Sequence, residues 1–266
     1  NPGRFYAVDD PGYPWKSVQQ SGEEAPFMQY VTGTPVSEAN PHYLRFTAKA
    51  AGQGFANKAY DGIRLEKDHT YRVSFYARCV AYEGDTFQIK VIKDGQVFAE
   101  AAVNAVKPVP YVPFCDLKIP MEIGYGTLNP EIQHIREMDQ SGKCRRSEWI
   151  KYEVVLTAQD DVRGAQFAIT FDVPGIVEFD LISMIPEDAV AGIFRKDLFE
   201  ALQAIKPGFV RFPGGCIVEG ISLDNRYYWK NTVGDVKDRR YIPNLWAFDD
   251  DWSKNDPMTK RPDAHY

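Results

Sequence analysis

Apolar and polar side chains alternate with a period of two in several short segments of the chain after residue 42. In the segment 71–79, Tyr71 and Phe75 fall on one face, and Arg72 and Arg78 fall on the other. Because successive side chains of a strand point to opposite faces of a sheet, this alternation predicts strands with one buried face. Similar segments, separated by Gly and Asp turns, lie at 43–48, 87–91, 97–99, 149–156, 165–173 and 176–185. About six to nine such strands predict a mainly β chain, an antiparallel β-sandwich of the jelly-roll type.

Two segments lack this alternation. Residues 1 to 40 are rich in Gly, Pro, Asp and aromatic side chains, which predicts loops with one or two edge strands. The segment 106–146 contains three prolines between 108 and 113 and then a short helical pattern at 130–138. We interpret it as a long insertion between two strands that covers one end or face of the sandwich.

The pattern changes from strand to helix near residue 187. Apolar side chains then recur at helical spacing from 194 to 205, and Lys-Pro-Gly at 206–208 predicts the end of that helix. Residues 209–212 predict a short buried strand, which a Pro-Gly-Gly loop follows at 213–215. We therefore predict a sandwich over 1–186 and an incomplete αβ unit of a (β/α)₈ barrel over 187–266. One αβ unit cannot cover both faces of a parallel sheet, so we expect the chain to be truncated.

Composition and charge limit the partners. Apolar residues make up 44% and charged residues 26%, as in ordinary soluble domains, and the net charge is −6. This charge argues against nucleic-acid or anionic-membrane partners, since phosphate-binding surfaces need a concentrated basic patch. No apolar run approaches the ~18 residues that a membrane-spanning helix needs.

Metal and nucleophilic sites have no support in the sequence. The four cysteines lack C-x-x-C spacing, and the four histidines are scattered. Cys115 and Cys144 flank the insertion, and both a disulfide and two thiols are compatible with their positions. Asp249 begins a calcium-like series, but Lys254 and Lys260 replace the Gly and Glu that a calcium loop requires. We expect no metal and no cofactor.

The stretch after the sandwich resembles glycoside hydrolase family 51, the α-L-arabinofuranosidases. The resemblance rests on Phe-Arg-Lys-Asp-Leu at 194–198, on Arg-Phe-Pro-Gly-Gly-Cys-Ile-Val-Glu-Gly at 211–220, and on 226–234, Arg239 and 243–246. It implies that this stretch is the helix before the second barrel strand, that strand and the loop after it. The sandwich is similar to the carbohydrate-binding-module-like domain of one branch of the family, and the first barrel strand is expected before Asn1. The insertion at 106–146 has no counterpart in the family.

The resemblance also implies a retaining mechanism with two glutamates, one after the fourth barrel strand and one after the seventh. Both strands would lie beyond Tyr266. Retention needs two carboxyl groups about 5–5.5 Å apart across the scissile bond. No Asn-Glu pair follows an apolar strand in this chain. We therefore assign no catalytic residue and expect the chain alone to be inactive.

Four residues of this stretch are candidates for a sugar pocket, and the resemblance implies the position of Cys216 in it. Cys216 would line the site of the terminal arabinofuranose, with a buried structural thiol as the alternative. Glu219 would bind sugar hydroxyls or pair with a loop arginine. Arg211 would be buried and would orient a carboxylate of a later strand, and Trp246 would stack on the leaving-group sugar or pack within its loop.

In the sandwich, Tyr13 and Trp15 are candidates for stacking on glycan rings, and ordinary packing is the alternative for both. The expected ligand is an arabinose-containing plant polysaccharide such as arabinoxylan or arabinan. We also expect contact with the missing part of the barrel or self-association, and an extracellular or periplasmic location in a bacterium. A non-catalytic glycan-binding or structural module remains the alternative function.

Overall fold

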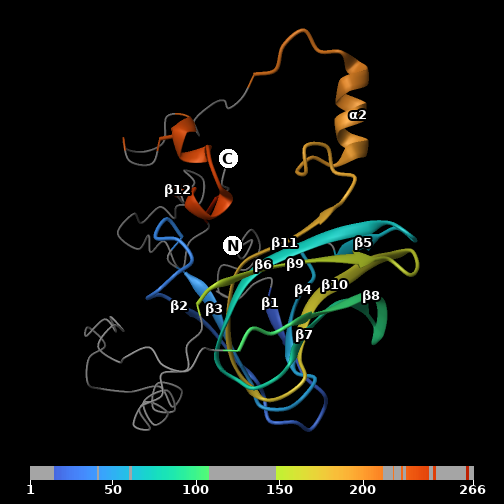
Figure 1. Ribbon diagram of the computed structural model, residues 1–266. Helices are drawn as coiled ribbons and strands as arrows, with labels where there is room; N and C mark the ends of the chain where they lie inside the picture. The colour runs from blue at the N-terminus through green and yellow to red at the C-terminus, as the bar shows by residue number, and fades with distance from the viewer. Residues whose placement is uncertain are drawn as a thin grey trace, which may run out of the picture.

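The computed structural model describes residues 15–40, 42–59, 62–107, 148–211, 218, 223 and 226–239, together with the backbone of 242–243 and 262–263. Eleven of its strands form two antiparallel sheets (Figure 1). The first sheet has the order β1 (Trp15–Val18), β4 (Gly54–Asn57), β10 (Val162–Phe171), β7 (Thr86–Lys93) and β8 (Gln96–Asn104), and β5 (Ile63–Leu65) also pairs with β10. The second has the order β2 (Phe27–Val31), β3 (Tyr43–Ala48), β11 (Gly175–Pro186), β6 (Thr70–Tyr82) and β9 (Ile150–Thr157). The predicted antiparallel β-sandwich is confirmed.

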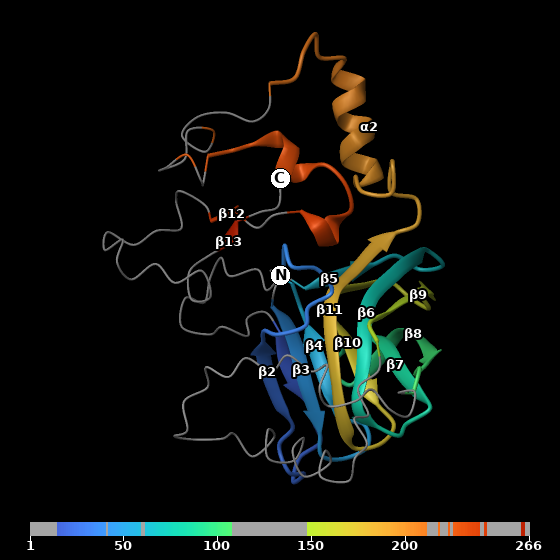
Figure 2. The same ribbon diagram turned by 60° about the vertical axis from the view of Figure 1, so that its left-hand side comes forward.

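The core between the sheets is built from the apolar faces of the alternating strands. Strands of both sheets run in broadly similar directions (Figure 2), so their inner side chains meet along the sandwich. Phe87 of β7 is fully buried, and its ring centroid lies 5.6 Å from that of Phe179 in β11 and 5.9 Å from that of Phe171 in β10. The predicted inner face of β6, including Phe75, is likewise buried.

The alternation of apolar and polar residues did not predict two short strands, β4 and β5. Residues 54–57 read Gly-Phe-Ala-Asn, and all but the asparagine are buried, so no alternation marks them. At Gly62, which precedes β5 with a φ of 83°, an added Cβ would lie 2.2 Å from Cα of Gly164. Only glycine permits this backbone contact. The sequence does not show that glycine is required at position 62, because the requirement comes from the partner strand.

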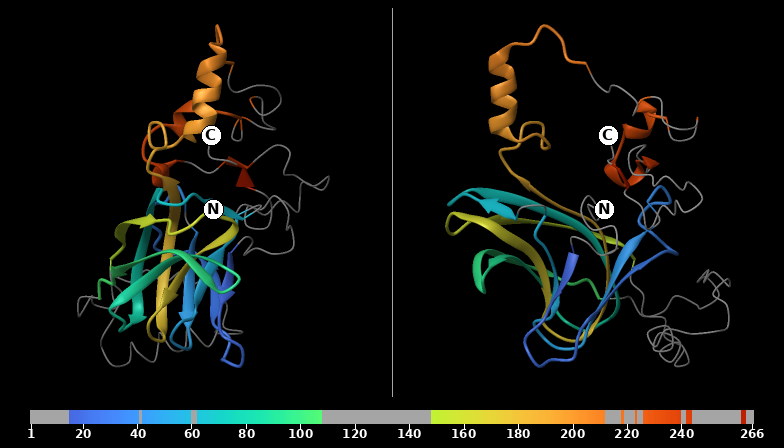
Figure 3. Two further views of the ribbon diagram at one scale, coloured as in Figure 1. Left: turned by 90° about the vertical axis from the view of Figure 1, so that its right-hand side faces the viewer. Right: turned by 180° about the vertical axis from the view of Figure 1, so that it is seen from behind.

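The helix after the sandwich is α2 (Lys196–Ile205), and it ends at Lys206 in the left-handed conformation with a φ of 50°. The predicted end at Lys-Pro-Gly is thus confirmed. The helix projects from one end of the sandwich (Figure 3), and none of its residues is buried. The division into domains at 186 and 187 stays a prediction.

The predicted buried strand at 209–212 is wrong for its described residues. Residues 209–211 form no strand, and Phe209 and Val210 are 84% and 81% exposed. A parallel strand is stabilised only by neighbours that satisfy its backbone hydrogen bonds, and no described strand pairs with these residues. The rest of this stretch lies outside the described residues, except Val218 and Leu223. So does the insertion from 108 to 147, with its predicted helix, Cys115 and Cys144.

Part of the segment after residue 225 contacts the sandwich. It contains two short 3₁₀ helices, η2 (Trp229–Thr232) and η3 (Val236–Asp238), and β12 (Ile242–Pro243) pairs with β13 (Pro262–Asp263). The Asn40 side chain donates to the backbone oxygens of Lys237, at 2.8 Å, and Arg239, at 3.1 Å. Ser37 Oγ donates to Asp238 Oδ1 at 3.0 Å. The turn between β2 and β3 therefore anchors η3.

Candidate sugar-binding surfaces

Of the four residues predicted to line a sugar pocket, the structure describes only Arg211. Arg211 is exposed, and the described part of the chain gives its side chain no carboxylate partner. The prediction that it is buried is wrong here, because no neighbouring strand encloses it. Cys216, Glu219 and Trp246 lie outside the described residues. The assignment of all four to a sugar pocket stays a prediction.

Of the two stacking candidates in the sandwich, Trp15 is described and Tyr13 is not. Trp15 lies in β1 at the edge of the first sheet, partly buried against the core. Its ring meets Phe55 edge-on at 5.4 Å and Phe167 at 6.4 Å. Both contacts use the apolar surface of the indole for packing, so substitution of Trp15 would change stability as well as any glycan contact. Its role in stacking stays a prediction.

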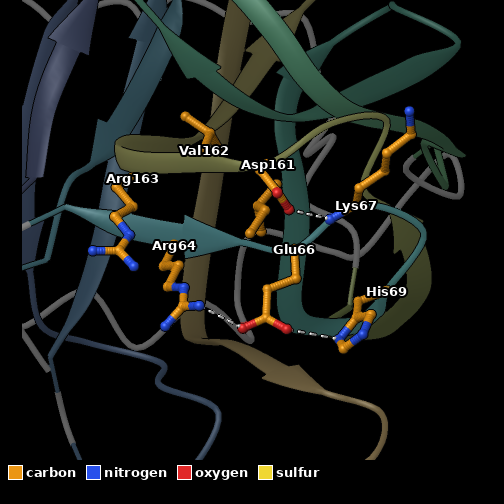
Figure 4. Close-up of a pocket in the computed structure, with 8 residues that line it drawn as sticks. Arg64, Glu66, Lys67, His69, Asp161, Val162 and Arg163 are labelled. Atoms are coloured by element: carbon orange, nitrogen blue, oxygen red, sulfur yellow. Dashed lines mark hydrogen bonds and ion pairs between the residues drawn. The ribbon is translucent and has the colours of Figure 1, made fainter.

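A polar pocket of about 440 Å³ lies between the turn that follows β5 and the turn that precedes β10 (Figure 4). Its polar lining residues are Arg64, Glu66, Lys67, His69, Asp161 and Arg163. Leu65 and Val162 also line it, but their side chains are buried in the core between the sheets. Sequence reasoning missed this pocket, because its two halves are almost 100 residues apart and neither half carries a motif.

The carboxylates of this pocket already have partners. Glu66 forms an ion pair with Arg64, with 3.0 Å between Oε1 and the guanidinium nitrogen Nη2. The Nδ1 atom of His69 lies 3.7 Å from the other carboxylate oxygen of Glu66. Asp161 Oδ1 accepts a hydrogen bond of 2.8 Å from the backbone N–H of Lys67. Arg163, in contrast, has no carboxylate partner among the described residues.

A second polar cluster is buried on the outer face of the second sheet. Glu178 of β11 is fully buried between Arg45 of β3 and Arg78 of β6, and both arginines bond to its carboxylate. The guanidinium of Arg78 also lies over the ring of Trp149, 4.4 Å from the centroid, and over that of Tyr43. The alternation in the sequence correctly places Arg78 on the polar face of β6. The burial of this cluster depends on strand register, which places Glu178 opposite both Arg45 and Arg78.

The described residues include one cysteine, Cys79, and its thiol is buried. Burial raises the pKa of Cys79 to about 12, so its thiol stays protonated at neutral pH. No group of three or more His, Cys, Asp or Glu side chains that could hold a metal occurs in the described part of the chain.

Asp180 follows the buried cluster on β11, at the bulge before Ser183. Its Oδ1 accepts from Leu181 N at 2.8 Å, whereas its Oδ2 is buried without a hydrogen-bond partner among the described residues. Burial raises the pKa of Asp180 from 3.8 to about 6. The neutral acid therefore fits this site better than the carboxylate.

This burial predicts a stability that depends on pH. The folded-state pKa is raised, so the contribution of Asp180 is fully present below about pH 4 and is lost as the pH rises through about 6. Asp180→Asn keeps the oxygen acceptor and removes the charge. We expect it to be more stable than the wild type at pH 7, by up to about 3 kcal/mol, and equally stable at pH 3.5. Urea unfolding across this range measures the difference, with exposed Glu100→Gln as the control. A constant difference between pH 3.5 and pH 7 would contradict the assignment.

Comparisons with known proteins agree on one family. A family model described as "Alpha-L-arabinofuranosidase 1 domain" matches residues 201–256. The chain is 41% identical over 201 residues to Alpha-L-arabinofuranosidase 1 of Arabidopsis thaliana, covering 75% of this chain and 24% of that protein. It is 32% identical over 228 residues to the Extracellular exo-alpha-L-arabinofuranosidase of Streptomyces chartreusis, covering 80% of this chain and 22% of that protein.

The chain is similar to one part of the α-L-arabinofuranosidases. The solved structure of an arabinose-bound GH51 α-L-arabinofuranosidase has the same fold, with a TM-score of 0.65 and 20% identity over 86% of this chain and 32% of that chain. The chain spans about a quarter of the length of the curated arabinofuranosidases that it matches.

Proposed function

We propose that this chain is part of a retaining α-L-arabinofuranosidase that removes terminal non-reducing arabinofuranosyl residues from plant polysaccharides such as arabinoxylan or arabinan. The observation that carries the proposal is the match over 201–256 to an arabinofuranosidase domain, joined to 41% identity over three quarters of the chain. The two catalytic glutamates are contributed by barrel strands outside this chain. The complete protein forms and then hydrolyses a covalent arabinosyl-enzyme.

The stretch from 209 to 246 supplies one wall of the arabinose pocket in this proposal. Cys216 and Glu219 contact the terminal sugar, Trp246 stacks on the leaving-group sugar, and Arg211 orients a catalytic carboxylate. The pocket is completed only when the remaining barrel strands pair with residues 209–212. Arg211 then leaves solvent for the barrel rim, where a buried guanidinium needs a carboxylate partner.

Hydrolysis of 4-nitrophenyl α-L-arabinofuranoside tests the proposal. We expect the complete protein to release 4-nitrophenol with arabinose of retained configuration, and this 266-residue chain to release none, because the carboxyl pair is missing. Release by this chain alone would show that the catalytic glutamates lie within it. Failure of the complete protein on aryl arabinofuranosides, arabinan and arabinoxylan would overturn the proposed activity.

The exposed apolar face of α2 supports a domain division after Pro186 and contact with the rest of the barrel. Leu198, Leu202 and Ile205 are each more than half exposed, at spacings that place them on one face of the helix. In a complete (β/α)₈ barrel such a face packs against the strands. Without the remaining strands, the same face promotes self-association of this chain.

Self-association is tested by sedimentation velocity over a range of concentrations. We expect the wild-type chain to associate as its concentration rises, and Leu202→Glu to remain monomeric, because a charge on the apolar face cannot be buried without a partner. Gln203→Glu changes an exposed polar residue of the same helix and should behave like the wild type. Equal association of Leu202→Glu and wild type would exclude the α2 face as the contact.

A non-catalytic glycan-binding or structural module is the second candidate. The two-sheet sandwich, which makes up most of the described chain, favours it. Glycan binding by this chain together with inactivity of the complete protein would support this candidate over the first.

We also propose an extracellular or periplasmic location in a bacterium. The Streptomyces chartreusis relative is, by its name, an extracellular enzyme. Among the described residues, no helix is long and apolar enough to cross a membrane. Fractionation of the producing cells, followed by immunodetection, tests this location.

A further inference from the structure

The polar pocket at the end of the sandwich has the features of an anion-binding site. In the antiparallel pairing of β5 with β10, the register shifts between Val162 and Ala165, so Arg163 and Gly164 oppose Arg64 alone. This bulge brings two arginines from adjacent strands to one place. Figure 4 shows both guanidinium groups at the same end of the pocket.

The charge at this end is not balanced. Glu66 pairs with Arg64, at 3.0 Å, whereas Arg163 has no carboxylate partner in the described part of the chain. The pocket lining as a whole carries the cations of Arg64, Lys67 and Arg163 against the carboxylates of Glu66 and Asp161, so one positive charge is left over in a chain whose net charge is −6. The ammonium group of Lys67 points away from the two guanidinium groups (Figure 4), so the two arginines are the cations that lie together. A guanidinium fork binds a planar carboxylate with two parallel hydrogen bonds, so the surplus charge fits a carboxylate ligand.

The rest of the pocket suits the ring of a sugar. Glu66, His69 and Asp161 line it with groups that form hydrogen bonds to sugar hydroxyls. The volume of about 440 Å³ lies within the range of about 300–1,000 Å³ that is common for small-ligand sites, and it accommodates one or two sugar rings.

We propose that this pocket binds a uronic acid residue of a polysaccharide, with Arg163 and Arg64 holding its carboxylate. The inference rests on the proposed function, since it takes the ligand to be a carbohydrate. The lining residues of the polar pocket all belong to the sandwich, and none of them is among the residues proposed for the arabinose pocket. The polar pocket would therefore anchor acidic polysaccharide chains without taking part in hydrolysis.

Calorimetric titration of the chain tests the proposal with two probes, a xylotetraose that carries one glucuronic acid and the same xylotetraose without it. We expect the acidic probe to bind at least ~10-fold more tightly, because a charge-assisted hydrogen bond adds to binding. Arg163→Gln should abolish this preference, and Arg163→Lys should retain part of it. Lys16→Gln, an exposed change in β1 at the edge of the same sheet, should leave both affinities unchanged.

Three outcomes would overturn the inference. They are equal affinity for the two probes, an unchanged preference in Arg163→Gln, and competition by inorganic sulfate as effective as that by the acidic probe. The last would indicate a general anion site. Because Arg163 is exposed, its substitution should not affect folding, and circular dichroism checks this. Hydrolysis of aryl arabinofuranosides by the complete protein is independent of this pocket, so failure here leaves the proposed activity untouched.

Discussion

Glu178→Gln is expected to lower the free energy of unfolding by about 3–5 kcal/mol, because two largely buried guanidinium groups lose the carboxylate that balances them. The side chain of Glu178 is fully buried, and those of Arg45 and Arg78 are only 11% and 5% exposed. The substitution keeps the size of the side chain and removes its charge. Urea unfolding, monitored by tryptophan fluorescence, measures the change.

The matched control is Glu153→Gln in β9 of the same sheet. Glu153 pairs with Lys151 at 2.6 Å, but both side chains are about half exposed, so little change is expected. Replacing Arg45, Arg78 and Glu178 together by apolar residues should cost less than Glu178→Gln alone, because no charge is then left buried without a partner. Similar stability of Glu178→Gln and Glu153→Gln would show that the cluster is open to water.

Phe87→Ala is expected to lower the free energy of unfolding by about 3–5 kcal/mol, the range typical of large-to-small changes in a packed core. Phe87 is fully buried in the first sheet, and its ring contacts Phe75, Tyr152 and Phe179 of the second sheet. Removing it leaves a cavity between the sheets that rigid neighbouring rings cannot fill. Thermal and urea unfolding measure the loss.

Phe27→Ala is the matched control, since Phe27 lies in edge strand β2 and is 41% exposed. Its removal should change stability much less. Phe87→Leu, which retains most of the apolar volume, should recover a large part of the loss. A loss in Phe87→Ala no greater than in Phe27→Ala would mean that the sheets do not pack through this ring.

Much of the fold could be predicted from local pattern. Strands such as β6 and β7 show the alternation that one buried face requires, and the helix stop at Lys206 follows from the Pro-Gly after it. The motifs after residue 193 led to the same family as the comparisons. β4 and β5 could not be found, because they are short and their burial depends on close contact with β10.

The candidate sites depended on contacts between distant segments. The pocket at Arg64 and Arg163 forms where a bulge of β10 meets β5. Neither segment has a sequence pattern that predicts the strand with which it pairs. The sequence placed Trp15 among the stacking candidates by residue type, whereas the structure packs its ring on Phe55 and Phe167. Residue type alone does not distinguish an aromatic side chain that binds a ligand from one that packs in a core.

By itself, the sequence determined the strand-rich architecture, the change to a helix after residue 186 and the resemblance to the α-L-arabinofuranosidases, because each depends on neighbouring residues in the chain. The tertiary structure alone decided that Glu178, which lies 133 residues from Arg45, is buried between two arginines. It also decided that residues 209–211 remain exposed. Strand register and the presence of a pairing partner determine both results, and neither is encoded in the local alternation of apolar and polar side chains.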